Sequence, residues 1–185
     1  GNSTLIQLAT IREYLKKDSS KVILFFFEND LEELSYEIKN NFLIQYINDN
    51  SFFKNLKDNQ KIVDNKNRYK IKKNISQKKQ NLSNLFKMVK LRGLINSYLF
   101  KERVNLELID DFDLVLTKLN QFINFKKSKL YVVYLDGYTE NKALKQKIED
   151  IVVRKNLNFI DFKKEIIDKN ISFKKLFPFE LPGHY

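Results

Sequence analysis

The single histidine of the chain, His184, lies in the stretch LFPFELPGHY at residues 176–185, which also holds both prolines. A polar pair, Asn29 and Asp30, closely follows the apolar run KVILFFF. An imidazole can take a proton from a nucleophile near neutral pH, and a side-chain amide can donate a hydrogen bond to a developing oxyanion. If His184 and Asn29 met at one site, they would suit acyl transfer or ester hydrolysis.

Helices and strands that alternate along the chain must position these side chains. Apolar residues at helical spacing predict helices over residues 4–17, 111–127 and 140–156. Three apolar runs predict strands at Lys21–Phe27, Lys129–Leu135 and Leu157–Phe162. This order predicts an α/β fold with a parallel sheet, right-handed crossovers and helices on both faces.

The predicted sheet indicates where a site would lie. Ligands of such sheets bind beyond the carboxyl ends of the strands. The first strand leads into Asn29, and the third leads through Asp161 towards His184. We therefore expect both residues at one edge of the sheet. The continuous apolar character of KVILFFF also predicts a first strand covered on both faces.

Residues 51–92 differ from the rest because they are rich in Lys, Asn and Gln, with scattered apolar side chains. A helical stripe remains at Leu82, Leu85, Phe86 and Val89. We interpret this segment as a polar helical insertion of one or two solvated helices within a single partial domain over residues 1–185.

Composition narrows the function classes. With 185 residues and 43% hydrophobic residues, the chain can fold as one domain, and no apolar run reaches the roughly 18 residues of a membrane helix. The absence of cysteine excludes disulfides, zinc–thiolate sites and cysteine nucleophiles. The net charge of +11 comes almost entirely from Lys, and it accompanies heavy use of Asn and Ile. Since AT-rich coding produces the same mixture, we expect no nucleic-acid partner, although a basic nucleic-acid-binding protein stays an alternative.

Three blocks of the chain, in this order, resemble the SGNH (GDSL-type) hydrolases. GNSTLIQLATIREY is similar to the second block of that superfamily and its helix, ILFFFENDLEEL to the third, and LFPFELPGHY to the last. The runs KLYVVYLDGY and LNFIDF resemble the fourth and fifth strands of one bacterial branch. The resemblance implies a three-layer α/β/α sandwich of flavodoxin-like type, here incomplete.

The family's site residues transfer to three positions. Gly1 would offer its backbone N–H and Asn29 its side-chain amide to the oxyanion, while His184 would be the general base. Ser3 could be mistaken for the nucleophile, because it follows Gly1 and Asn2 in the stretch GNS. Only one helix and one strand fit between Gly1 and Asn29, whereas an additional strand separates the family's nucleophile from its asparagine. We interpret Ser3 as opening the helix that follows, as a cap or in its first turn.

The chain also departs from the family pattern. Phe27 stands near the position of a family glycine, and Leu181 replaces the acid usually found three residues before the histidine. Glu180 is the first alternative for orienting the imidazole, and Asp161 or Asp168 are others. The nucleophilic serine block would precede Gly1. We therefore expect these 185 residues to be part of a longer protein and to have no esterase activity alone.

The resemblance implies a serine esterase, O-acyl hydrolase or acyltransferase that acts on acyl or acetyl esters of small molecules or glycans, without metal or cofactor. A parent protein at the cell envelope would fit that branch. A non-catalytic binding domain of the same fold is the main alternative, because the acid before His184 is missing.

Overall fold

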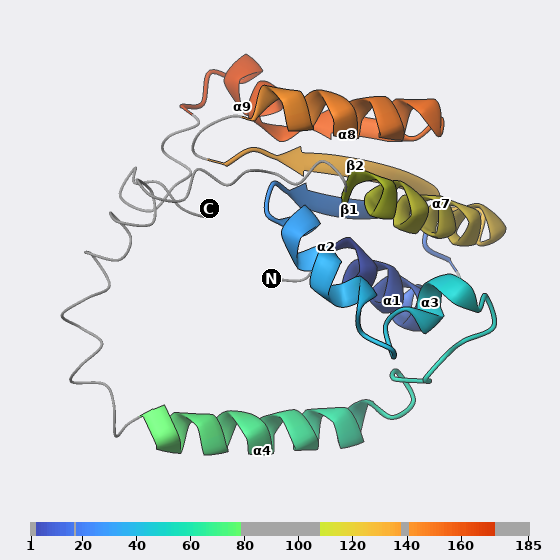
Figure 1. The fold of residues 1–185 in the computed structure, drawn as a ribbon, viewed down its shortest axis with the longest axis vertical. Coiled ribbons are helices and arrows are strands. Elements are labelled where there is room, and N and C mark those ends of the chain that lie inside the picture. Colours follow the sequence, from blue (N-terminus) through green and yellow to red (C-terminus); the bar gives the residue numbers. More distant parts are fainter. Residues whose placement is uncertain (1–2, 17, 79–107, 138–140, 173–185) are drawn as a thin grey trace. The chain divides into compact units, whose positions relative to one another are not determined.

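The structure of the protein, a computed structural model, describes residues 3–16, 18–78, 108–137 and 141–172 (Figure 1). The chain divides into two compact units, Gly1–Phe53 with Val104–Tyr185 and Lys54–Arg103. The described elements of the first unit are α1 (Thr4–Tyr14), β1 (Lys21–Phe27), α2 (Asp30–Ile38), α3 (Gln45–Asn48), α7 (Ile109–Phe125), β2 (Lys129–Leu135), α8 (Lys142–Arg154), β3 (Asn158–Asp161) and α9 (Phe162–Asp168).

A parallel sheet in the order β1-β2-β3 forms the centre of the first unit. Its register aligns Lys21 with Lys129 and Tyr131 with Asn158. The predicted α/β class is confirmed, and the first two strands have the predicted bounds. The third strand ends at Asp161, because the Asp161 carboxylate accepts a hydrogen bond from the N–H of Lys164 at 3.0 Å and caps α9 there.

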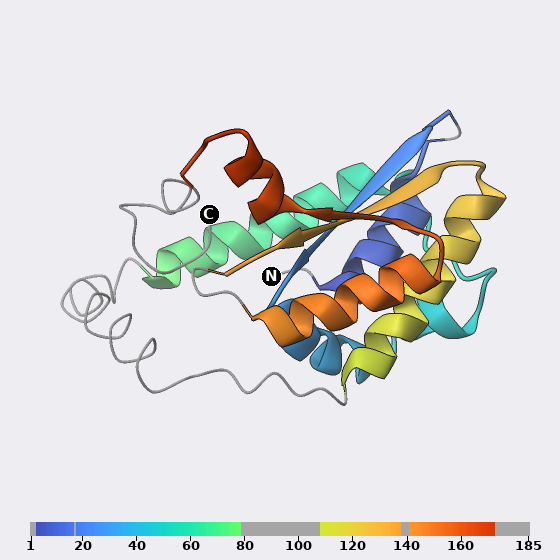
Figure 2. The same cartoon turned by 90° about the horizontal axis from the view of Figure 1, so that it is seen from above.

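One face of the sheet carries the hydrophobic core. Side chains alternate between the two faces of a strand, so Val22, Leu24 and Phe26 of β1 point to the same side and are buried. Right-handed crossovers place successive helices of a 1-2-3 parallel sheet on one face. Figure 2 shows α1, α2, α7 and α8 on that side and α9 on the other, and buried residues of all four helices join the core cluster.

The opposite face of β1 is exposed. Ile23 and Phe25 are 54% and 51% exposed, although their strand is continuously apolar. The prediction that β1 is covered on both faces is therefore wrong for the described chain. The reason is positional: β1 lies at one edge of the sheet, while α9 contacts β2 and β3.

A carboxylate from α2 caps the first helix. Ser3 occupies the N-cap position of α1 in extended conformation, but its hydroxyl makes no capping bond within that helix. Instead, Glu37 accepts hydrogen bonds from the N–H groups of Ser3 at 3.0 Å and Ile6 at 3.2 Å, and also from the Ser3 hydroxyl. Glu37 thus satisfies donors that begin the helix without partners, and it joins α1 to α2.

The second unit contributes one described helix, α4 (Gln60–Lys78). This helix is polar around its circumference, and Ile62, Tyr69 and Ile71 are more than half exposed. The predicted insertion over 51–92 overlaps this unit, whereas its predicted apolar stripe at 82–89 lies outside the described residues. Within the described part of the chain, every helix is too short or too polar to cross a bilayer.

Replacing the capping carboxylate should destabilise the fold. Glu37→Ala leaves buried N–H groups and the Ser3 hydroxyl without their acceptor, so we expect a loss of about 2 kcal/mol in the free energy of unfolding. Urea denaturation followed by circular dichroism measures this loss. Glu32→Ala, an exposed residue of the same helix, is the matched control and should change stability by less than about 0.5 kcal/mol. Equal effects of the two substitutions would contradict the capping role.

Candidate functional site

Polar side chains gather beyond the carboxyl ends of all three strands. Glu28, Asn29 and Asp30 follow β1, Asp136 follows β2, and Asp161 ends β3. The strands are parallel and adjacent, so these ends share one edge of the sheet. We call this edge, formed by residues 28–30, Asp136, Asp161 and the first turn of α8, the carboxyl edge.

Asn29 is placed at the turn between β1 and α2. It is the N-cap residue of α2, but its backbone has helical dihedral angles and its side chain makes no capping hydrogen bond. Its amide nitrogen instead donates a long hydrogen bond of 3.5 Å to the Glu33 carboxylate. The amide is half-buried and weakly engaged, so it can reorient towards an oxygen atom at the carboxyl edge.

The next residue, Asp30, is a buried carboxyl group. Its Oδ2 accepts the backbone N–H of Phe27 at 2.9 Å, which closes the turn after β1. Burial raises the pKa of Asp30 to about 7, the Phe27 hydrogen bond opposes this shift, and the neighbouring charges of Glu33 and Glu37 add to it. With a pKa of about 7, Asp30 is about half protonated at pH 7, which reduces the negative charge beside Asn29.

Lys145 joins the ends of β2 and β3. Its Nζ lies 2.6 Å from Oδ2 of Asp161 and 3.3 Å from both carboxylate oxygens of Asp136. The Asp136 side chain is fully buried, while those of Lys145 and Asp161 are 12% and 21% exposed. The N-terminal end of a helix carries a partial positive charge, which disfavours the ammonium of Lys145 in the first turn of α8. The two carboxylates must therefore hold the lysine in this position.

Burial and charge act in opposite directions within this cluster. Burial raises the pKa of Asp136, and the ammonium of Lys145 limits the rise. Desolvation lowers the pKa of Lys145, but its hydrogen bond to Asp161 and the charges of both carboxylates outweigh that effect and leave the pKa raised. Lys145 therefore stays protonated and unsuited to act as a base or nucleophile. Its role at this edge is to fix the two strand ends.

A further bond connects the turn after β1 to α8. Oε1 of Glu28 accepts the backbone N–H of Asn141 at 3.1 Å, and the Asn141 side chain accepts the N–H of Leu144 at 3.1 Å as the N-cap of α8. The turn that carries Asn29 is thus fastened to the helix that carries Lys145, and the three strand ends form one connected edge.

The structure places part of the predicted site. Asn29 and Asp161 lie at the carboxyl edge, but Asp161 is engaged by Lys145, and Asp168 is exposed at the end of α9. Gly1, Glu180 and His184 lie outside the described residues. Ser3 is fully buried and bonded to Glu37, so its hydroxyl is inaccessible to a substrate, in agreement with its interpretation as a helix-opening residue.

Sequence analysis missed the clamp formed by Lys145, Asp136 and Asp161. Asp136 follows an apolar run and precedes Gly137, as an ordinary turn residue would, and Lys145 is one of many lysines in the chain. A local signal is that Lys145 lies in the first turn of α8, where the helix dipole disfavours a cation. The lysine-rich composition concealed it.

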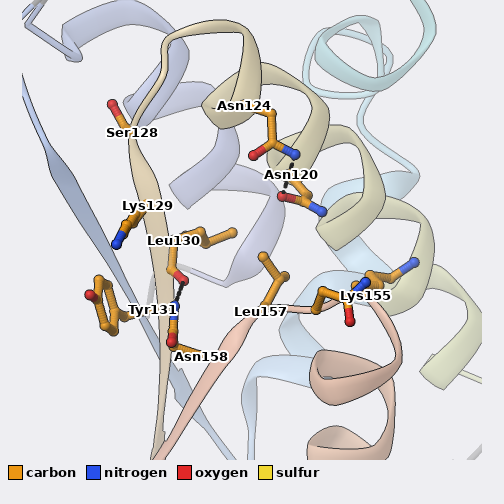
Figure 3. A pocket seen from close by; sticks show the side chains of 10 residues that line it. Asn120, Asn124, Ser128, Lys129, Leu130, Tyr131, Lys155, Leu157 and Asn158 are labelled. Carbon is orange, nitrogen blue, oxygen red and sulfur yellow. Dashed lines mark hydrogen bonds between the residues drawn. The ribbon is translucent and has the colours of Figure 1, made fainter.

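A polar pocket of about 460 Å³ lies at the other end of the strands, around the first residues of β2 and β3 (Figure 3). Figure 3 shows Asn120 and Asn124 of α7 on one side of β2, with Lys129 and Tyr131 pointing away from that helix. The Asn124 amide donates to Asn120 at 3.1 Å, and Asn158 donates to the carbonyl of Leu130 at 3.3 Å. The amides of Asn124 and Asn158 thus donate hydrogen bonds to other residues of the pocket lining. No described lining residue is a histidine or carboxylate, so this lining offers no acid–base pair.

Among the described residues, no group of three or more His, Asp or Glu side chains is arranged to hold a metal ion. Comparison with protein-family models, curated proteins and solved structures finds no significant match to this chain.

The buried carboxyl of Asp30 should make stability depend on pH. Its pKa of about 7 in the folded protein exceeds the ordinary value of 3.8, so the folded state holds a proton that the unfolded chain releases between those values. The stabilisation is complete below about pH 4 and is lost as the pH rises through about 7. Asp30→Asn should remove this loss, so the variant gains a few kcal/mol relative to the original chain between pH 4 and pH 7.

Urea unfolding at several pH values measures that difference. Glu32→Gln, an exposed carboxylate on the same helix, is the control and should leave the pH profile unchanged. A constant difference between the original chain and Asp30→Asn across this range would show that the Asp30 pKa is ordinary.

Removing the lysine of the clamp should be costly. Lys145→Met leaves the buried carboxylate of Asp136 without its cation, so we expect a loss of about 3 kcal/mol in stability at pH 7. The loss should shrink at acidic pH, where Asp136 becomes protonated. A double-mutant cycle with Asp136→Asn measures the coupling, and strictly additive effects would contradict the clamp.

Proposed function

We propose that this chain is part of an SGNH-type serine esterase or O-acyltransferase that acts on acyl esters, with acetyl esters as the first class to test. The observation that carries the proposal is the position of Asn29. Its amide follows the first strand of a parallel sheet, at the edge where ligands of such sheets bind, and it makes only a long 3.5 Å contact to Glu33. That is the place and the chemistry that an oxyanion donor requires.

The order of elements adds support. A helix follows the Gly1–Ser3 stretch, a strand then leads into Asn29 and Asp30, and two further helix–strand units follow before the stretch that contains His184. This is the order of blocks that the SGNH resemblance implies. In a complete sandwich, an additional layer over the exposed side chains of Ile23 and Phe25 would cover the free face of β1.

In this proposal a serine upstream of Gly1 attacks the ester carbonyl carbon while His184 accepts the serine proton. The carbonyl oxygen becomes an oxyanion that receives hydrogen bonds from the Asn29 amide and the Gly1 N–H. The C–O bond to the leaving alcohol then breaks, and the histidine returns the proton to that alcohol. Water, or the hydroxyl of an acceptor, repeats the sequence in reverse on the acyl-enzyme and takes the acyl group.

The proposal requires His184 to lie near the carboxyl edge, where its imidazole would be close to several carboxylates. Glu28 and the partly compensated pair Asp136 and Asp161 lie at this edge, and a negative environment stabilises a protonated imidazole. The protonation of Asp30 at neutral pH limits the repulsion that an oxyanion near Asn29 would experience. Glu180 is the first candidate for orienting His184, and Asp161 and Asp168 are the alternatives.

The first test is to read the coding frame upstream of Gly1 and to assay the protein that it encodes on p-nitrophenyl acetate. We expect a Gly-Asp-Ser block upstream and measurable turnover. His184→Ala should abolish turnover, and Asn29→Ala should lower kcat about 100-fold with little change in KM, because the oxyanion forms only in the transition state.

Asn41→Ala, an exposed asparagine in the turn after α2, is the matched control and should keep the original kcat. A kcat that Asn29→Ala leaves unchanged would remove Asn29 from the oxyanion site. A folded full-length protein that lacks an upstream serine block and any turnover would contradict the esterase and favour the non-catalytic binding domain.

A further inference from the structure

A second pocket of the first unit, away from the carboxyl edge, has an unusual lining. Its volume is about 380 Å³, and it lies between the end of α1, the loop after α3 and the end of α7. These two helices end shortly before β1 and β2 begin, so the pocket belongs to the amino side of the sheet. The size is within the range of pockets that hold small organic ligands.

The charge of this pocket has one sign. Among the residues that the structure describes, its lining includes Arg12, Lys118 and Lys126 and no carboxylate. Arg12 is 6% exposed, and its guanidinium donates to the carbonyls of Tyr46, Asp49, Asn50 and Phe52. Arg12 thus fixes the loop after α3 and also places a desolvated cation at the base of the pocket. An anion entering the pocket is attracted by all three groups.

Aromatic rings form the other half of the lining. The Arg12 guanidinium lies 5.0 Å from the ring centre of Phe53, and the Lys126 ammonium lies 5.6 Å from Phe122 and 5.4 Å from Phe125. Phe53 is 43% exposed and Phe125 is 78% exposed. Two uncovered phenylalanine rings beside cations can stack on a flat apolar body while the cations bind its charge.

Local structural needs explain only part of this arrangement. A cation at the end of a helix interacts favourably with the free carbonyls there, which accounts for Arg12 and Lys126. Lys118 lies about two turns before the end of α7, too far from that end for a favourable interaction with the helix dipole. The exposure of Phe125 serves no packing role either. Both features are accounted for by a ligand that carries an anionic group and an apolar ring.

We propose that this pocket binds a small aromatic anion, that is, a carboxylate or phosphate monoester attached to a flat apolar group. The rings of Phe53 and Phe125 hold the flat group, and Lys118 and Lys126 bind the charge. The pocket is independent of the proposed esterase site, because Asn29 and the carboxyl edge lie at the opposite ends of the strands.

Binding of 1-naphthyl phosphate to the 185-residue chain, measured by isothermal titration calorimetry, tests this assignment. Inorganic phosphate and 1-naphthol separate the two halves of the ligand. We expect 1-naphthyl phosphate to bind at least tenfold more tightly than either. Lys126→Gln and Phe125→Ser should each weaken that binding by about tenfold. Phe125 is exposed and Lys126 is half-buried at the C-cap of α7, so the fold should survive either replacement.

Matched controls are Lys142→Gln and Tyr36→Ser, which remove an exposed lysine and an exposed aromatic ring outside the pocket. They should leave the affinity for 1-naphthyl phosphate unchanged. Equal affinities for 1-naphthyl phosphate and 1-naphthol would overturn the anion site, and an affinity unaffected by both pocket substitutions would place binding elsewhere on the chain. Since the readout is binding, it is unaffected by whether the esterase proposal holds.

Discussion

The burial of one face of the three-stranded sheet is the constraint on which the first unit depends. Side chains alternate along β1, so Leu24 and Phe26 can be buried only if helices cover their side. Right-handed crossovers bring α7 and α8 to that same side. Burial of the core therefore fixes these helices against one face of the sheet. The polar groups at the ends of the helices and strands must then find hydrogen-bond or charge partners at the two edges of the sheet.

Three charged groups, two of them buried and Lys145 largely so, meet that requirement in different ways. Glu37 accepts the first N–H groups of α1, Lys145 connects carboxylates at the ends of β2 and β3, and Arg12 donates to the carbonyls of the loop after α3. Glu37 and Arg12 join elements 34 positions apart in the sequence, while Lys145 joins the ends of the two strands on either side of its own helix. Burial makes each of them costly to leave unpaired, so they restrict the arrangement of elements more strongly than exposed charges would.

The two edges of the sheet, at the carboxyl ends and at the amino ends of the strands, carry different side chains. The carboxyl edge combines carboxylates, one bridging lysine and the weakly bonded amide of Asn29. The amino side combines cations with exposed rings such as Phe125, which suits recognition of a ligand rather than its conversion. A catalytic site at one edge and a recognition site at the other would be held rigidly apart by the length of the strands.

The sequence by itself determined the α/β class, the bounds of β1 and β2 and the place of Asn29, because apolar runs and helical spacing are local signals. Periodicity also predicted a helix that Ser3 opens. Only the tertiary structure decided that Glu37 caps that helix, that Lys145 joins Asp136 to Asp161, and that one face of β1 is exposed. Those features depend on contacts between side chains of different helices, strands and loops, and neither composition nor spacing records which of those side chains meet.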